Sequence, residues 1–199
     1  MAAQSQAAHA APPARPQRPP RSAVPALPTL EHLDHTHRRL LQALVELGHL
    51  VEHLAEHGVD AGARHSARTL CRFFGSQARQ HHADEETLVF PPLVRKGDAQ
   101  LIEQVLRLQQ DHGWLEEDWL ELAPQLQAVA EGYSWYELDL LRHGVQVFTS
   151  LYHEHIALEE SLIYPEARRQ LALEADCRER RVSAAAEPPP ATAAAPSSS

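Results

Sequence analysis

The chain has 199 residues, a formal net charge of −9 at pH 7 and a pI near 5.8. This length suggests one domain with tails, and the acidic balance argues against a nucleic-acid partner, which would need basic side chains for phosphate contacts. Cys71 and Cys177 are too few for a disulfide framework and lack the spacing of a thiolate metal site. No apolar run approaches the ~18 residues of a membrane span. We therefore expect a cytoplasmic protein without a membrane or nucleic-acid partner.

The two ends of the chain differ from its middle. Residues 1–28 are rich in Ala, Pro, Gln and Arg and lack the apolar stretch of a secretory signal, and residues 176–199 become rich in Ala, Pro and Ser. Such segments have little apolar surface to bury. We expect disordered tails at 1–28 and 176–199 and one folded domain at 29–175.

The first predicted helix follows Thr29, a favourable N-cap residue, and ends near His57, where Gly58 offers a stop. Its apolar stripe, at ~100° per residue, consists of Leu33, Leu40, Leu44, Leu47, Val51 and Leu54. His37 falls inside this stripe, whereas His35 falls on the opposite face. Only His37 of this pair is expected to point inward.

The second predicted helix starts after residues 60–62 and runs to about Arg95. Its expected inner face consists of Leu70, Phe74, Gln77, His81, Glu85 and Leu88. His82 and Glu86 fall ~100° or more further round the helix. Because proline lacks an N–H, Pro91 and Pro92 should disturb or end the last turn.

The third predicted helix begins near Asp98 and continues to Glu131, with a kink or break expected at Pro124. Its stripe consists of Leu101, Val105, Leu108, His112, Leu115 and Trp119. Glu116 follows His112 by one turn on the same side.

The fourth predicted helix opens at residues 134–137, where Ser134 and Glu137 fit a capping box, and continues past Pro165 to about Glu174. Its inner face takes Leu141, Gly144, Phe148, Leu151, His155, Glu159 and Leu162. Four helices with short connections favour an all-α, up-down-up-down four-helix bundle.

One pattern occurs twice, at residues 81–91 and 155–165: His-x-x-x-Glu-Glu, three residues, an aromatic residue and a proline. Because i and i+4 lie on one face of a helix, each copy directs an imidazole and a carboxylate the same way. Buried carboxylates are costly unless they are paired or bind metal. We therefore predict a metal site from the inward set His37, His81, Glu85, His112, His155 and Glu159.

Imidazole and carboxylate ligands without thiolate suit iron, manganese or zinc. Two carboxylates between two histidine sets suit a dinuclear centre. The order here, histidine before glutamate, reverses the Glu-x-x-His motif of ferritin-like di-iron bundles.

The other polar residues of interest are interpreted as surface. The remaining histidines are predicted to be solvated: His9, His32, His35, His49, His53, His57, His65, His82, His143 and His153. Glu86 and Glu160 are likewise expected on a solvated helix face. Tyr152 points partly inward, either to donate a hydrogen bond to a bound oxygen species or to pack the core.

Residues 29–175 resemble the hemerythrin-like domains of the HHE cation-binding family. The resemblance rests on residues 34–40, His81 and Glu85 with Phe90-Pro91, His112, and His155 and Glu159 with Tyr164-Pro165. It implies a bundle with two non-haem irons bridged by two carboxylates and an oxo or hydroxo group. His37, His81, His112 and His155 would be terminal ligands, and Glu85 and Glu159 would bridge the irons.

Glu116 departs from the oxygen-carrying hemerythrins, which have a second histidine at this position. It is included among the candidate ligands. The alternatives are that it contacts a metal ligand without binding metal itself, or that it turns away into a salt bridge. As a ligand it would add negative charge, favour ferric iron and disfavour reversible oxygen carriage.

The expected function is that of a di-iron protein that binds or senses dioxygen, nitric oxide or iron. The alternatives are a redox enzyme acting on peroxide or nitric oxide, an iron donor for damage repair, and a bundle in which the metal serves only the fold. The expected ligand is dioxygen or another small diatomic molecule or peroxide. A signalling role would require a protein partner.

Overall fold

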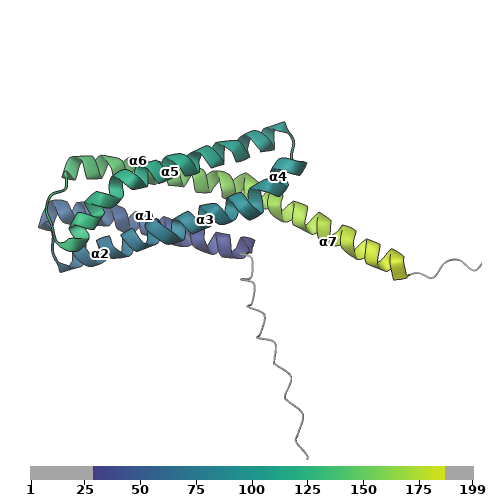
Figure 1. Ribbon diagram of the computed structural model, residues 1–199, viewed down its shortest axis with the longest axis horizontal. Helices are drawn as coiled ribbons and strands as arrows, with labels where there is room; N and C mark the ends of the chain where they lie inside the picture. The colour runs from purple at the N-terminus through teal and green to yellow at the C-terminus, as the bar shows by residue number, and fades with distance from the viewer. Residues whose placement is uncertain (1–28, 187–199) are drawn as a thin grey trace, which may run out of the picture.

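The computed structural model describes residues 29–186, which form helices and short connections with no strand in this range (Figure 1). The all-α prediction is confirmed. The tail predicted at 1–28, and residues 187–199 of the tail predicted at the other end, lie outside the described residues.

Four helical rods make the bundle. The first is α1 (Leu30–His57); the second is continuous through α2 (Ala61–Arg72), η1 (Phe73–Ala78), α3 (Arg79–Asp84), η2 (Glu85–Val89) and α4 (Phe90–Lys96). The third is α5 (Ala99–Glu131), and the fourth joins α6 (Leu138–Leu158), η3 (Glu159–Ile163) and α7 (Tyr164–Ala186). The segments labelled η are π-helical. Contacts link α1 with α2, α2 with α5, α5 with α6 and α6 with α1, which closes the predicted up-down-up-down ring.

The helix ends follow local capping chemistry in most places. The side chains of Thr29, Asp60 and Asp98 accept hydrogen bonds from backbone N–H groups of the first turns. Gly132 ends α5 in the left-handed conformation, with φ 95°. The predicted capping box is wrong: α6 begins at Leu138, and Glu137 in the N-cap position makes no side-chain capping bond.

Pro91 and Pro92 disturb the second rod without ending it there, and the fourth rod continues past Pro165 as expected. A π-helical turn precedes each aromatic–proline pair, so the N–H of Phe90 donates to the carbonyl of Glu85, and that of Tyr164 to Glu159, five residues back. In an α-helix, the proline ring clashes with the carbonyl four residues earlier. Here that carbonyl belongs to the wider π turn.

At Pro124 the structure excludes the break, one of the two alternatives expected there, and it corrects the predicted end of the fourth rod. α5 runs without a break across Pro124, which is exposed, so that the carbonyl left without an N–H partner can bind water. The fourth rod continues to Ala186, past the end expected near Glu174, and leaves the bundle as the yellow helix of Figure 1. This part of α7 carries helix-favouring Ala, Leu, Glu and Arg residues and an Arg180–Asp176 pair one turn apart.

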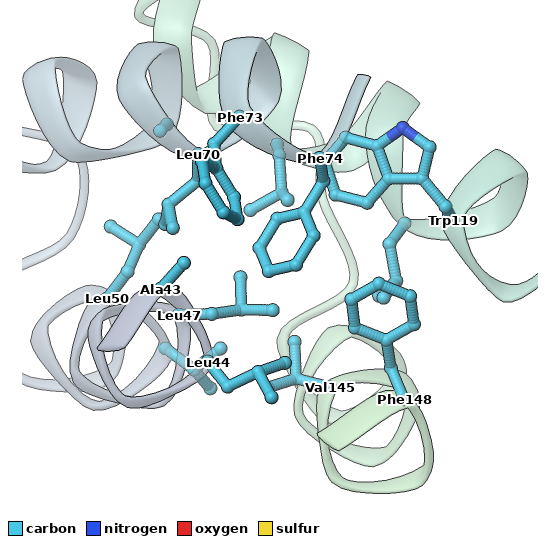
Figure 2. Close-up of a cluster of buried hydrophobic side chains, with 14 of the residues drawn as sticks. Ala43, Leu44, Leu47, Leu50, Leu70, Phe73, Phe74, Trp119, Val145 and Phe148 are labelled. Carbon is cyan, nitrogen blue, oxygen red and sulfur yellow. The ribbon is translucent and has the colours of Figure 1, made fainter. Parts of the chain in front are cut away.

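The core forms two clusters of buried apolar side chains. The larger, which includes Phe74, Trp119 and Phe148, fills the end of the bundle near the α1–α2 turn; Figure 2 shows these three rings facing one another. The smaller, which includes Leu93 and Tyr164, fills the other end. Along every rod the two clusters are separated by a turn that carries the predicted metal ligands.

No helix in the described part of the chain has an apolar stretch long enough to cross a bilayer.

Candidate metal centre

Six of the seven predicted ligands meet in the gap between the two apolar clusters. Their exposed fractions are 0% for His37, Glu85 and Glu159, 1% for His155, 3% for His81 and 6% for His112. Each rod contributes at least one of them. The burial follows from helical phase, because each lies on the same stripe as the leucines and aromatic residues of its rod.

The two buried carboxylates each face two histidines from different rods. Glu85 lies 3.3 Å from His81 Nε2 through Oε1 and 3.5 Å from His112 Nε2 through Oε2. Glu159 lies 3.3 Å from His155 Nε2 through Oε1 and 3.1 Å from His37 Nε2 through Oε2. Each carboxylate thus directs one oxygen to each of two histidine pairs.

These contacts define two positions that share both carboxylates. His37 and His81 form one four-residue group with Glu85 and Glu159, and His112 and His155 form the other. Within each group one ligand atom per residue lies within 4.8 Å of all the others. We call these the His37–His81 position and the His112–His155 position.

The outer nitrogens of three of these candidate histidines face carboxylates. His37 Nδ1–H donates to Glu160 at 3.2 Å and His112 Nδ1–H donates to Glu86 at 2.9 Å, while Asp111 lies 3.8 Å from His155 Nδ1. A proton held on Nδ1 leaves the Nε2 lone pair free to bind a cation.

The prediction that Glu86 and Glu160 are merely solvated is therefore wrong. Both are about half exposed, with 44% and 50% of the side chain accessible, yet each contacts the outer nitrogen of a buried candidate ligand, His112 or His37. Their repetition in the two motif copies was the signal that could have identified them.

Each motif copy contacts a histidine on one of the two rods that lack the motif. Phe90 of the first copy stacks on His112, with ring centroids 5.7 Å apart, and Tyr164 of the second stacks on His37 at 5.0 Å. Each copy therefore supplies a carboxylate and an aromatic ring to one distant histidine. The bundle holds its site with an approximate internal symmetry.

Tyr164 also brings a polar group that sequence reasoning missed. Its hydroxyl donates to Glu85 Oε1 and lies 3.1 Å from His37 Nε2. Burial and the carboxylates of Glu85 and Glu159 raise the pKa of this phenol, which keeps it protonated. Tyr152, the tyrosine considered from sequence, is buried and packs against Phe148.

Glu116 does not join either group. Its side chain is 44% exposed and pairs with Arg79 at 2.6 Å. Of the three roles considered for Glu116, the structure shows the salt bridge. Its exposed partner, Arg79, lies on the neighbouring rod.

His82 is not the solvated residue expected. It is half-buried and stacks on His112, with ring centroids 4.1 Å apart, and its ring lies 5.6 Å from that of His155. Burial, followed by the neighbouring His112, lowers the pKa of His82 well below its usual value. The imidazole is therefore neutral at pH 7.

The electrostatics of the site suit a cation. Burial disfavours imidazolium, but Glu159 and Glu85 outweigh it and raise the pKa of His37 to about 9. Burial is outweighed at His155 too, where Glu159 and Asp111 raise the pKa to about 10. Despite its burial, the pKa of Glu85 is held well below the usual value by His81 and His112. Glu85 is thus ionised, and the imidazoles of His37 and His155 carry protons that a metal ion would replace.

Several buried ligand atoms lack a hydrogen-bond partner among the described residues: His81 Nδ1 and Nε2, Glu85 Oε2 and both oxygens of Glu159. Buried polar atoms without partners are rare because each costs free energy. Nitrogen and oxygen donors that converge without thiolate fit a divalent cation of the iron, manganese or zinc type.

Two openings lead toward the centre from solvent. A pocket of about 560 Å³ is lined by Arg79, His82, Glu86, His112 and Glu116, among others. A smaller one of about 190 Å³ reaches His81 from the α1 side. Small molecules can therefore approach both positions.

Fold and site together define a helical bundle with a buried histidine and glutamate cage for cations. The sequence matches the hemerythrin HHE cation binding domain over residues 29–167, and the chain belongs to this family. It is also similar to an uncharacterized protein of Haemophilus influenzae, with 31% identity over 126 residues that cover 63% of this chain and 71% of that protein.

Proposed function

We propose that the site holds two non-haem irons, one in each histidine position, with Glu85 and Glu159 bridging them. The observation that carries this proposal is the way each carboxylate directs its two oxygens to different histidine pairs. A site for one cation would not need two groups that share both carboxylates. We further propose that the loaded protein binds or senses dioxygen, with nitric oxide or iron as the other ligands considered.

The surroundings of the site support binding of a small, uncharged ligand. Phe90 and Tyr164 are buried and stack on His112 and His37, and apolar clusters close both ends of the gap. Iron would supply the electrons that bind a diatomic molecule, and these apolar groups would limit the water around it. The free thiols Cys71 and Cys177 fit the reducing conditions of the cytoplasm, where we place the protein.

The first experiment measures metal content and the optical spectrum of protein prepared without a histidine tag. We expect two irons per chain, and fewer in Glu85→Ala, which removes an oxygen from both positions. Ferrous protein prepared without air should gain an absorption band on exposure to dioxygen and lose it on degassing. A band that never reverses would contradict reversible binding of dioxygen. Fewer than two irons in the unmutated protein would contradict the two-iron site.

The alternative function is redox catalysis on peroxide or nitric oxide, or donation of iron for damage repair. The observation that favours a reaction is the polar pocket of about 560 Å³ beside His112, which has more room than a diatomic ligand needs. Steady-state consumption of peroxide or nitric oxide that disappears in Glu85→Ala would support an enzyme. Turnover no faster than that of free iron would contradict it.

A further inference from the structure

We infer that His82 is the third histidine ligand of the His112–His155 position. This inference rests on the two-metal site proposed above and names the ligand that completes it. The sequence had suggested Glu116 for this role.

The geometry of three rings carries the inference. One ring nitrogen each from His82, His112 and His155 lies within 4.8 Å of the other two, the same closeness that unites the predicted ligands. The Nε2 atom of His82 is buried and has no hydrogen-bond partner within the described range. A buried imidazole nitrogen with a free lone pair and two ligand histidines beside it is placed to bind the same cation.

The two motif copies differ at this position. The residue after the motif histidine is His82 in the first copy and Ile156 in the second, where it is buried in the larger apolar cluster. The His112–His155 position therefore gains an imidazole that the His37–His81 position lacks. The latter has the Tyr164 hydroxyl nearby instead.

Glu116 is held away from this role. Its carboxylate pairs with Arg79 at 2.6 Å, and both residues line the outer part of the pocket that His82 lines further in. Ligation by Glu116 would require it to leave that ion pair, whereas His82 already lies beside His112.

The identity of the ligand changes the charge of the site. A neutral imidazole adds no negative charge, so Glu85 and Glu159 remain the only anionic side chains among the proposed ligands. The expected preference for ferric iron, which followed from ligation by Glu116, then disappears. The objection to reversible ligand binding, which followed from ligation by Glu116, disappears with it.

The first test counts metal-bound histidines by NMR in the unmutated protein, loaded with zinc as a diamagnetic probe and labelled with ¹⁵N-histidine. We expect five metal-bound imidazoles, from His37, His81, His82, His112 and His155. Binding of two zinc ions with only four bound imidazoles would overturn the role of His82 and leave the two-metal site intact. Binding of fewer than two ions would contradict the two-metal proposal itself.

The second test measures affinity for the second ion by competition with a chelator. His82→Gln should lower it by about tenfold or more, whereas Glu116→Gln and the exposed control His143→Gln should leave it unchanged. Loss of affinity in Glu116→Gln with none in His82→Gln would overturn the inference. The circular dichroism and urea midpoint of metal-free His82→Gln show whether it is folded, and the NMR count needs no variant.

Discussion

The outer carboxylates Glu86 and Glu160 show how a half-exposed residue can set the properties of a buried one. Each accepts the Nδ1 proton of a ligand histidine from another rod, and this fixes the tautomer with Nε2 toward the cation. They connect a helix surface with the centre of the bundle. Their effect should therefore appear in metal affinity rather than in folding.

Replacing Glu160 by glutamine tests this role. The amide accepts the His37 proton more weakly than a carboxylate, so we expect metal affinity to fall by about 10- to 100-fold, measured by chelator competition. Glu103→Gln, an exposed glutamate of α5, is the matched control and should change nothing. Equal affinities in the two variants would show that Glu160 is only solvated surface.

Tyr164→Phe removes the hydroxyl between Glu85 and His37 and keeps the ring that stacks on His37. The metal-free protein should lose about 1–3 kcal/mol of unfolding free energy, because a buried carboxylate oxygen loses its donor. Urea unfolding without metal measures this loss. Tyr136→Phe at a partly exposed position is the control, and a similar small change in both variants would contradict the prediction.

At the scale of elements, the π-helical turns explain where helical phase failed. A π turn contains an extra residue, so a count at ~100° per residue stops one residue before the position that is actually buried. Gln77, Leu88 and Leu162 were expected on the inner face, but Ala78, Val89 and Ile163 are the buried residues.

Gly132, at the end of α5, and Gly48, inside α1, should respond to alanine substitution with opposite changes in the free energy of unfolding. Gly132 ends α5 at φ 95°, where a side chain is strained, so Gly132→Ala should cost about 1 kcal/mol. Gly48 lies inside α1 with nothing within 4 Å of an added Cβ, and Gly48→Ala should stabilise the protein by about 0.5–1 kcal/mol. Changes of the same sign in urea unfolding would contradict this account.

At the scale of the whole molecule, the site interrupts an otherwise apolar core. Two clusters stabilise the ends of the bundle, while the middle buries two carboxylates and several histidines. Without metal, these groups are balanced by one another, by the carboxylates of Glu86, Glu160 and Asp111 and by the Tyr164 hydroxyl. Metal binding should therefore raise the stability of the whole bundle.

The pH dependence of metal-free stability tests this balance. The pKa values of His37 and His155 are raised to about 9 and about 10 in the fold. Their protonation stabilises the fold fully below the unfolded pKa near 6.5, and this contribution disappears as pH rises through 9 and 10. The expected loss is on the order of 3 kcal/mol for His37, at about 1.36 kcal/mol per pKa unit.

Urea unfolding from pH 7 to 10 measures this loss in the metal-free protein. In the loaded protein the cation replaces these protons, so its stability should not show the same fall and its metal affinity should rise with pH. A flat profile without metal would show that the two histidines are neutral in the fold.

Periodicity and the repeated motif were enough to predict the bundle, the inward position of His37 and the convergence of six ligands, because these depend on residue spacing within single helices. The π turns, the turn of Glu116 toward Arg79, and the contacts of Glu160 and Tyr164 with His37 depend on contacts between rods. Helical phase placed His82 one face away from His81, but only the packing of α3 against α5 and α6 brought its ring onto His112. Spacing along one helix cannot show which side chains of other helices occupy the space beside it, and this is why the tertiary structure alone decided the surroundings of the metal centre.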